Sequence, residues 1–385
     1  MTGQPIRVAF PPIGGNIWAG GQNYLRNLVS ALRQFDAARV QPVLFADAGY
    51  SPATVCEIIA AGAEVVRDER FARERQLRRA VSALTTGSDA MAAAVYRTAN
   101  IDMAFENVTY HGWRFPLPVL TWFPDMQHRE MPQMFSKLGW WRRDVAFRLA
   151  IGKGRHVLLS SESARADLLR AYPDCRAQLH IVPFAVPEPD PIARSDVAAA
   201  QIELELPRKW FFLPNQFWQH KNHGLVVEAL AIATTKHPEI VVVCTGSTQD
   251  PRNPNAFTML MTRVASAGLK NNFRSLGQVP FSRVQALMQG AIALINPSKF
   301  EGWSTTVEEA KALGLPMLLS DIAVHREQAD GIANFFAIDD YEELARQLTG
   351  LWIAPPRRRS TDDGAARKSF ANRFADVTEI VVGRR

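Results

Sequence analysis

One stretch of the chain, residues 296–314, reads NPSKFEGWSTTVEEAKALG and decides the predicted fold. The apolar strand Ala291–Ile295 runs into it, and a short polar turn with Glu301 then opens a helix that carries Glu309. A helix that begins at the carboxyl end of a strand presents backbone N–H groups to an anion. Amides for a phosphate, with two carboxylates for sugar hydroxyls, predict a pocket for a nucleotide sugar.

Two neighbouring glutamates of this helix receive different predicted roles. The pattern Thr305-x-x-Glu308 is typical of a capping box, in which Glu308 folds back onto the helix start. That arrangement leaves Glu309 to point elsewhere. The alternative is that Glu301 is a turn residue and Glu309 lies on a solvated helix face. The succession of strand, Glu-Gly turn, capped helix and second glutamate favours the binding site.

Length and composition set the broad class. A chain of 385 residues with 47% hydrophobic and 21% charged residues predicts a globular protein of two domains. Its three cysteines have no metal-type spacing, which fits a reducing compartment. The amino-terminal residues resemble no signal peptide, and no apolar run reaches the roughly 18 residues of a spanning helix. We therefore expect a cytoplasmic protein.

Positive charge is concentrated in two segments of a chain whose formal net charge is +6. They are Arg70–Arg79 and Lys137–Arg148, and the second mixes tryptophans with arginines on a predicted amphipathic helix. Such a helix suits a membrane interface, so peripheral contact with the inner face of the membrane is one expectation. The alternative is a solvated basic face whose tryptophans pack inward. No nucleic-acid-binding motif accompanies the charge, so we expect no nucleic acid partner.

Apolar strands alternate with helical patterns twice along the chain, with the proline-rich stretch Val186–Pro191 between the two series. The strands predicted in the first series are Ile6–Phe10, Val43–Phe45, Ala63–Val66, Met103–Phe105, Val119–Trp122, Val157–Ser160 and His180–Phe184. Those of the second are Trp210–Leu213, Glu239–Cys244, Phe273–Leu276, Ala291–Ile295, Leu315–Leu319 and Phe335–Ala337. This α/β pattern predicts two Rossmann-like parallel-sheet domains, residues 1–188 and 189–354, facing each other across a cleft.

The first loop of each half follows a strand and opens a helix. Pro11–Gly21 lacks both the G-x-G-x-x-G spacing and a P-loop lysine, but Gly20 and Gly21 allow a ligand to approach the backbone. A plain flexible turn is the alternative. In the second half, Lys221 precedes Asn222, a good N-cap residue. A cation at the positive end of a helix dipole is mildly unfavourable, so a bound diphosphate would remove the conflict.

A third segment, Thr121–Glu130, also follows a strand and should face the same cleft. Its candidates for hydroxyl partners or proton carriers are Asp125, Gln127 and His128, although a lone histidine is more often structural. The acidic pair at 339–340 precedes a helix and is most simply an N-cap. We therefore predict no metal site.

Together these segments resemble a retaining GT-B glycosyltransferase of group 1, the family 4 type, over nearly the whole chain. The family's Glu-x7-Glu motif is met by Glu301 and Glu309. The further matches are Ala310 and Gly314, the Gly20-Gly21 loop, Ser160–Ser163, Lys221-Asn222 and the loop Gly277–Pro280. The resemblance also implies that a terminal helix, Ala365–Val382, returns to the first domain, so that residues 365–385 complete it.

The resemblance implies a role for each matching residue. Glu309 would hold the ribose hydroxyls, Glu301 would contact the donor sugar, and Lys221 would neutralise the leaving diphosphate. The further donor-side residues would be Gly302, Trp303, Ser304 and Thr305 through their amides, with Asn215, Gln216 and the nucleobase-facing Val279. The acceptor side would be shaped by Gly20, Gly21, Asp125 and His128. No metal or other cofactor is expected.

Two positions depart from the family pattern. Asn215-Gln216 stands where the family often has Gly-Arg, and Pro124-Asp125, with His128 nearby, stands where it often has His-Asp. The leading prediction is transfer of a hexose from GDP- or UDP-hexose to a glycan or lipid-linked acceptor, in bacterial surface polysaccharide synthesis. The alternatives are a GT-B sugar-nucleotide epimerase and a catalytically silent module that binds sugar nucleotides or glycans.

Overall fold

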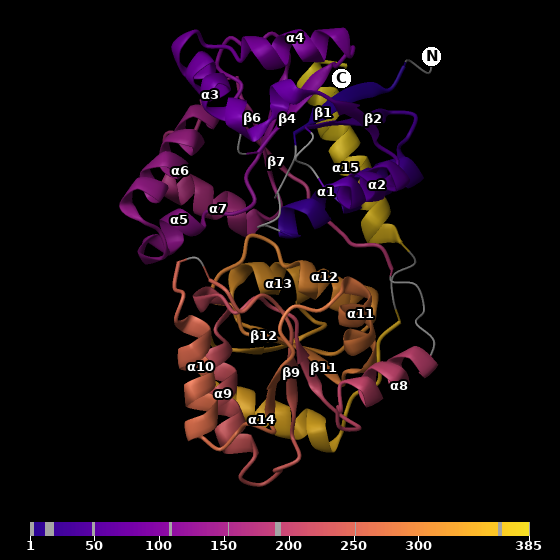
Figure 1. Ribbon diagram of the computed structural model, residues 1–385, viewed down its shortest axis with the longest axis vertical. Coiled ribbons are helices and arrows are strands. Elements are labelled where there is room, and N and C mark those ends of the chain that lie inside the picture. Colours follow the sequence, from indigo (N-terminus) through magenta and orange to yellow (C-terminus); the bar gives the residue numbers. More distant parts are fainter. Residues whose placement is uncertain are drawn as a thin grey trace. The chain divides into compact units, whose positions relative to one another are not determined.

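The computed structural model describes most of the chain in two compact units (Figure 1). One unit comprises Met1–Pro187 with Gly364–Arg385, and the other comprises Glu188–Asp363. The described residues are 4–11, 19–47, 51–107, 110–152, 154–188, 194–250, 252–360 and 364–384. Among them, no helix is long and apolar enough to cross a membrane.

The first unit is built on a parallel sheet in the order β3-β2-β1-β4-β5-β6-β7. Its strands are β1 (Ile6–Phe10), β2 (Val40–Ala46), β3 (Glu64–Arg67), β4 (Met103–Glu106), β5 (Val119–Trp122), β6 (His156–Leu159) and β7 (Gln178–Ile181). The central strands are short runs of apolar residues buried on both faces, as expected for a parallel sheet covered by helices.

Helices and 3-10 turns connect these strands. They are α1 (Ala19–Phe35), α2 (Pro52–Ala61), η1 (Glu69–Phe71), η2 (Arg73–Arg75), α3 (Gln76–Thr85), α4 (Ala90–Thr98), α5 (Gln127–Glu130), η3 (Pro132–Met134), α6 (Lys137–Ala150), α7 (Glu162–Ala171) and the terminal α15 (Ala365–Val382). Helix α1 begins at Ala19, so Gly20 and Gly21 lie in its first turn rather than in the predicted loop. Residues 12–18 of that loop lie outside the described residues.

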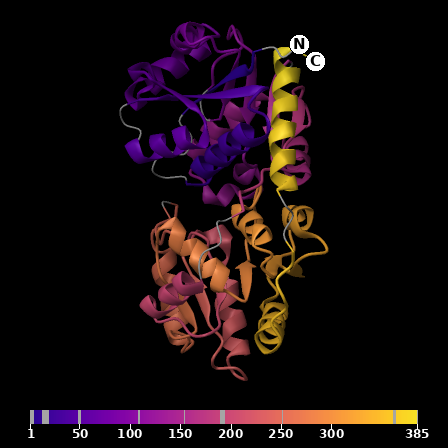
Figure 2. The same cartoon turned by 90° about the vertical axis from the view of Figure 1, so that its right-hand side faces the viewer.

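The terminal helix packs against the beginning of the chain, as the resemblance implied. Figure 2 shows α15, in yellow, running along the first unit. Arg39, just before β2, reaches Asp376 at 2.6 Å and Glu379 at 2.9 Å. The Phe374 ring lies 6.2 Å from the Phe10 ring and is fully buried. Residues from both ends of the sequence therefore share one core.

The second unit is built on a second parallel sheet, in the order β10-β9-β8-β11-β12-β13. Its strands are β8 (Phe211–Leu213), β9 (Val242–Cys244), β10 (Phe273–Ser275), β11 (Ala293–Asn296), β12 (Met317–Ser320) and β13 (Asn334–Phe336). Its helices and 3-10 turn are α8 (Arg194–Glu203), η4 (Gln219–Lys221), α9 (His223–Ala233), α10 (Ala256–Ser266), α11 (Phe281–Gly290), α12 (Thr305–Ala312), α13 (Ala323–Ala329) and α14 (Tyr341–Ile353). Two Rossmann-like parallel-sheet units confirm the predicted fold class.

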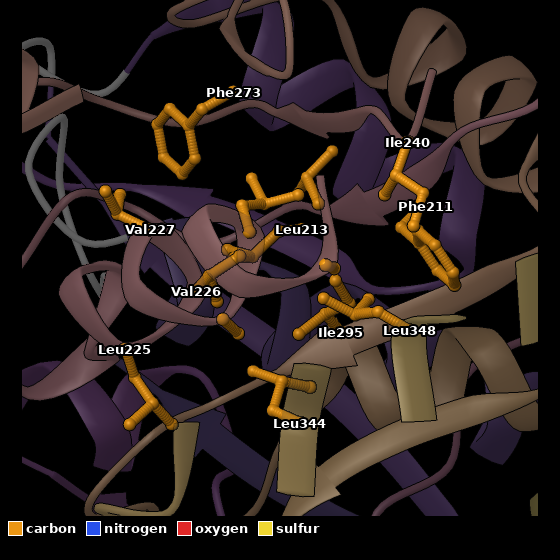
Figure 3. Packing of buried hydrophobic residues seen from close by; sticks show 14 of the residues in the cluster. Phe211, Leu213, Leu225, Val226, Val227, Ile240, Phe273, Ile295, Leu344 and Leu348 are labelled. Atoms are coloured by element: carbon orange, nitrogen blue, oxygen red, sulfur yellow. The ribbon is translucent and has the colours of Figure 1, made fainter. Parts of the chain in front are cut away.

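One hydrophobic cluster of the second unit joins its sheet to helices α9 and α14 (Figure 3). Phe211 and Ile295 contribute from neighbouring strands, Val226 from α9, and Leu344 and Leu348 from α14. All five side chains have essentially no exposed surface. Burial of one such side chain stabilises a fold by roughly 1.5–3 kcal/mol. The sheet is therefore a firm base for the loops at its carboxyl edge.

The segment after α14, which the sequence marks as a boundary, packs onto the second unit instead. The Arg358 guanidinium donates to the carbonyl oxygens at the end of α11, including Gln289, and to Leu313 O at 3.2 Å. Arg359 N donates to Gly314 O at 2.9 Å. The φ of Gly314 is +58°, and a Cβ there would lie 2.1 Å from Arg359 O, so only glycine fits this contact.

Candidate functional site

The candidate site lies where the strand order of the second sheet reverses. Strands β8 and β11 are neighbours; β9 and β10 continue on one side, and β12 and β13 on the other. Ligands of open α/β sheets bind outside the carboxyl ends of the strands at such a switch point. The loops that follow β8 and β11 carry Lys221 and Glu301, respectively. Topology thus brings two predicted site residues to one edge.

Lys221 and Glu301 form an ion pair at this switch point. Lys221 Nζ lies 2.5 Å from Glu301 Oε1, and the two side chains are 15% and 10% exposed. Burial on its own raises the pKa of the Glu301 carboxyl group, but Lys221, with smaller contributions from His220 and His325, holds that pKa below its usual value. Glu301 is therefore ionised near neutral pH. The site holds a cation, Lys221, and an anion, Glu301, that are both largely shielded from solvent.

Hydrogen bonds lock the two loops to each other. Asn215 Nδ2 donates to Asn296 Oδ1 at 3.1 Å, and Asn296 Nδ2 donates to Ser304 Oγ at 2.9 Å. The backbone adds Lys299 N to His220 O at 2.8 Å. Both asparagines are buried, so their amides are costly to leave unpaired. The backbone around the ion pair is held in place before any ligand binds.

The Glu-Gly turn passes directly into α12. Gly302 and Trp303 lie in the turn, Ser304 is the N-cap residue, and Thr305 is the first helical residue. Ser304 N donates to Gln328 Oε1 at 3.0 Å, and Gln328 Nε2 donates back to Ser304 O at 3.1 Å. A side chain of α13 thus fixes the backbone at the start of α12, where the helix macrodipole favours an anion.

The predicted capping box between Thr305 and Glu308 is wrong. Because Ser304 occupies the N-cap position, Glu308 points into the unit and is 4% exposed. Its Oε1 accepts from Gln328 Nε2 and pairs with Lys311 Nζ, both at 2.9 Å. Burial raises the pKa of the Glu308 carboxyl despite these partners. The next residue, Glu309, is more exposed than Glu308 and Ala310 on either side of it.

The buried residue His325 is connected through Ser320 to the turn that carries Glu301. His325 Nδ1 donates to Ser320 O at 2.9 Å, and Ser320 Oγ donates to Ser298 O at 2.5 Å. The His325 side chain is fully buried, and its Nε2 has no hydrogen-bond partner among the described residues. Burial lowers the pKa of His325, and the Glu301 carboxylate partly offsets this. The ring is thus neutral, with an acceptor nitrogen near the ion pair.

Four residues that support the site, Ser298, Ser320, His325 and Gln328, were not among those predicted from the sequence. A usable signal was present, because Ser320 ends an apolar strand at the carboxyl edge of the sheet. His325 and Gln328 are three residues apart and so share one face of α13. Polar residues at helical spacing, just after a strand of the same sheet, indicate a helix face turned toward the site.

The remaining donor-side candidates lie on adjoining loops. Gly246, after β9, has a φ of +137°, and a Cβ there would lie 2.6 Å from Asn215 O. Gly246 N donates to Gly277 O at 2.8 Å, at the start of the loop that carries Val279. Trp218 N donates to Gln216 O at 2.7 Å. The predicted residues Asn215, Gln216 and Val279 therefore belong to one connected set of loops.

Asp125 and His128 belong to the first unit, as do Gly20 and Gly21. Asp125 Oδ1 accepts from Gln127 N at 2.9 Å and from Arg143 Nη2 at 2.7 Å. His128 is fully buried, and burial lowers its pKa to about 4, so the ring is neutral near pH 7. Its Nε2 donates to Tyr172 OH at 3.0 Å. Of the two predicted acceptor-side side chains, only Asp125 has exposed surface.

His128 is part of a buried polar cluster that we call the Asp144 network. Its members are Asp144, Tyr172, His128, Arg129 and Arg148. Tyr172 OH donates to Asp144 Oδ1 at 2.7 Å, Arg148 Nε lies 3.0 Å from Asp144 Oδ2, and Arg129 also pairs with Asp144. Burial acts against the charged form of Asp144, but these donors hold its pKa below the usual value. The network fixes the turn that follows β5.

No group of three or more histidine, cysteine, aspartate or glutamate side chains that could hold a metal ion occurs among the described residues.

Comparison with known families gives a match over the second unit. Residues 197–368 match the model of the family described as glycosyl transferases group 1. A curated relative, the O-antigen chain mannosyltransferase RfbU of Salmonella typhimurium strain LT2, is 22% identical over 225 residues. That alignment covers 58% of this chain and 59% of the relative, so the chain spans little more than half of the relative's length. The match confirms the predicted resemblance to glycosyl transferases of group 1 over residues 197–368.

Solved structures share the fold over nearly the full chain. A glycosyltransferase from Rickettsia africae ESF-5 superposes with a TM-score of 0.68 at 14% identity, covering 99% of this chain and 98% of its own. Anabaena Alr3699/HepE in complex with UDP and glucose gives 0.65 at 16% identity, covering 98% and 96%. Sucrose-phosphate synthase from Thermosynechococcus elongatus gives 0.66 at 18% identity, covering 99% and 97%. At these identities the likeness establishes the GT-B fold.

Proposed function

From the match of residues 197–368 to the glycosyl transferases of group 1, we propose that the protein transfers a hexose from a nucleotide diphosphate sugar to a glycan or lipid-linked acceptor. The observation that carries the proposal is the Lys221–Glu301 pair at the switch point of the second sheet. Its two groups match the two parts of such a donor. An ammonium attracts a diphosphate, and a carboxylate accepts hydrogen bonds from sugar hydroxyls.

The chemical step forms a bond between an acceptor hydroxyl oxygen and the anomeric carbon of the donor sugar. It breaks the bond between that carbon and the diphosphate oxygen, and the hydroxyl proton passes to the leaving diphosphate. Negative charge grows on the leaving diphosphate, and Lys221 together with the start of α12 stabilises that charge. The amides of residues 302–305 contribute at the same place. We expect this reaction to require no metal ion, because the Lys221 side chain and backbone N–H groups would stabilise the charge on the leaving diphosphate. We propose that the anomeric configuration is retained, as the family resemblance implies.

The nucleoside part of the donor would lie along the adjoining loops. Glu309 would hold the ribose hydroxyls, and Val279 would face the base beside Asn215 and Gln216. The His325 Nε2 acceptor adds a position for a sugar hydroxyl or a water molecule below Glu301. GDP- and UDP-hexoses are the candidate donors, and the UDP found with the Anabaena protein makes UDP sugars the first to test.

The first unit would supply the acceptor side. Asp125, on the turn after β5, is the side chain we assign to acceptor contact, with Gly20 and Gly21 at the start of α1. His128 would act through the Asp144 network, by positioning the turn that carries Asp125. The similarity to an O-antigen chain mannosyltransferase supports an acceptor in surface polysaccharide synthesis. We place this reaction in the cytoplasm, with peripheral contact at the inner face of the membrane.

Release of nucleoside diphosphate tests the proposal. A panel of UDP- and GDP-hexoses is first screened by thermal shift, and release from the best binder is then measured with and without a glycan or lipid-linked acceptor. We expect acceptor-dependent release that falls strongly in Lys221→Ala but not in Lys299→Ala. Lys299 is the matched control, because it is exposed on the same turn as Glu301.

The same measurement separates the alternatives. Conversion of the donor sugar without any acceptor would identify an epimerase, and tight nucleotide-sugar binding with no turnover would identify a silent binding module. Either result would contradict the proposed transfer.

A further inference from the structure

Helix α3 of the first unit exposes its apolar face to solvent and buries an arginine. Its apolar residues Leu77, Val81 and Leu84 follow the helical spacing of a single face, yet all three are exposed, Leu77 by 75%. The buried positions are Arg79 and Ala83 instead. An amphipathic helix normally buries its apolar stripe against the core, so an exposed stripe of this kind marks an interaction surface.

The inward position of Arg79 explains how α3 is held this way round. Arg79 Nε lies 2.8 Å from Asp89 Oδ2, and its guanidinium covers the Phe71 ring at 4.5 Å from the centroid. Asp89 is fully buried and also caps α4 by accepting from Ala92 N. Breaking such a buried pair leaves an unpaired charge in the interior, which is strongly unfavourable. The outward direction of the apolar face is therefore fixed by the fold.

An exposed tryptophan stands close to the end of the same helix. Trp113 is 57% exposed, and its ring packs against Gly87, two residues after α3 ends. Arg114 N donates to Gly87 O, which fixes this loop. A Cβ on Gly87 would lie 2.8 Å from the Trp113 ring, so only glycine lets the tryptophan sit there. Tryptophan is enriched at membrane–water interfaces, where its ring is partly apolar and partly wet.

Helix α6 of the same unit shows a second stripe of this type. Leu138, Trp141 and Val145 are exposed at helical spacing, whereas Asp144 and Phe147 face inward. The alternative of a basic face with inward-packed tryptophans is met by one of the two tryptophans, and contact with a membrane stays a prediction. Trp140 packs inward, with its Nε1 donating to His128 O at 2.7 Å, and Trp141 faces solvent. Both α3 and α6 lie at the left of the first unit in Figure 1.

Charge decides which partner suits these stripes. Arg75 and Arg78 are exposed beside Leu77, and within the described residues neither forms an ion pair; Lys137 and Arg142 are exposed on α6. A symmetric contact with a second copy of the chain would place each basic patch against itself, since a two-fold interface uses the same surface twice. An anionic lipid surface attracts arginine and accepts leucine and tryptophan.

We propose that the exposed apolar faces of α3, with Trp113, and of α6 dock the first unit onto an anionic lipid bilayer. The purpose of this docking surface rests on the proposed function. Docking would bring the acceptor-side unit close to a lipid-linked acceptor. The apolar side chains enter the interfacial layer of the bilayer, and the arginines stay at the level of the anionic headgroups.

Co-sedimentation with vesicles tests this surface on the full chain. The probes are vesicles of equal parts phosphatidylglycerol and phosphatidylcholine, and vesicles of phosphatidylcholine alone, each at low and at high salt. We expect binding to the anionic vesicles at low salt, and at least tenfold weaker binding for Leu77→Ser/Val81→Ser and for Trp141→Ser. Arg75→Gln/Arg78→Gln should weaken binding about fivefold per charge removed.

The control is Ile202→Ser, which removes an apolar side chain that is 78% exposed on α8 of the second unit. It should bind vesicles like the wild type. Unchanged binding by the α3 and α6 variants, or no wild-type binding to anionic vesicles at low salt, would overturn the proposal. So would a dimer, seen by light scattering, that Leu77→Ser/Val81→Ser converts to a monomer.

Failure of this proposal is distinguishable from failure of the proposed function. Donor binding measured by calorimetry in solution, without lipid, should be the same in the α3 variants and the wild type. A protein that binds nucleotide sugars but no vesicles keeps the transferase proposal and loses the docking surface. Vesicle binding without nucleotide-sugar binding gives the reverse result.

Discussion

The Lys221–Glu301 pair of the second unit and the Asp144 network of the first unit are both clusters of charged and polar side chains, but they differ in how fully the protein itself satisfies them. Asp144 is 2% exposed and accepts from a tyrosine and two arginines. The Lys221 and Glu301 side chains keep 15% and 10% of their surface. Asp144 is saturated by protein donors, whereas Lys221 and Glu301 remain accessible to a ligand. Such accessibility separates a candidate site from a structural network.

Removal of Asp144 should have the largest effect, and the effect should be on stability. Asp144→Ala leaves the Arg129 and Arg148 guanidiniums and Tyr172 OH without their acceptor, and breaking such a buried group costs about 3–5 kcal/mol. Urea unfolding measures this loss. The control is Glu57→Ala, which removes an exposed partner of Arg26 and should cost less than about 1 kcal/mol. Equal losses in the two variants would contradict the structural role.

Replacement of Lys221 should affect turnover rather than folding. Lys221→Ala removes the cation that we propose stabilises the leaving diphosphate, and we expect kcat to fall about 100-fold, equivalent to about 3 kcal/mol. Steady-state kinetics with the identified donor measures the effect, and a thermal melt verifies the fold. Wild-type kcat in this variant would remove Lys221 from the mechanism and make the pair a structural one, like the Asp144 network.

A smaller effect is expected at Glu309, and it should appear in donor affinity. Loss of the proposed ribose hydrogen bonds in Glu309→Ala should weaken nucleoside diphosphate binding by roughly 0.5–3 kcal/mol, measured by calorimetry. Glu308→Gln is the matched neighbour, because its side chain faces inward and can keep the hydrogen bond with Gln328. If both variants bind alike, Glu309 does not contact the ribose.

The smallest effect is a pH dependence that sharpens the same comparison. Burial lowers the pKa of His128 from 6.5 to about 4, so the unfolded chain takes up this proton first. This contribution to stability is therefore complete above about pH 6.5 and is lost as the pH falls toward 4. His128→Gln should make the decline shallower by at most about 1.4 kcal/mol per pH unit. Urea unfolding at pH 7.5, 6.5 and 5.5 checks this, and identical slopes would contradict it.

Strand patterning and the site-forming loops could be predicted from the sequence because each leaves a local trace. The bounds of β1 and β5 agree with the predicted strands, and Lys221 and Glu301 follow strands that proved to be neighbours. The prediction that Glu308 completes a capping box was wrong because such a box depends on which residue is the N-cap. Ser304 takes that position, one residue before Thr305. A one-residue shift rotates a helical side chain by about 100°, here into the core.

The contacts of the supporting residues could not be predicted, because they join elements far apart in the sequence. The spacing of His325 and Gln328 indicates a helix face turned toward the site, but nothing near Gln328 indicates that its partner is Ser304, 24 residues away. The orientation of α3 has the same origin. Its periodicity defines an apolar face, but the buried Arg79–Asp89 pair decides which way that face points.

The packing of α15 against the start of the chain has a consequence for synthesis. Phe370 and Phe374 complete the core around Phe10 and Tyr24, and they leave the ribosome some 350 residues later. The second unit, whose residues 188–363 are contiguous, can fold while translation continues. The first unit is synthesised earlier, but its core stays incomplete, with apolar surface exposed, until α15 has been made. The unit that is synthesised first therefore completes its fold last, and a chaperone bound to it would protect this surface during synthesis.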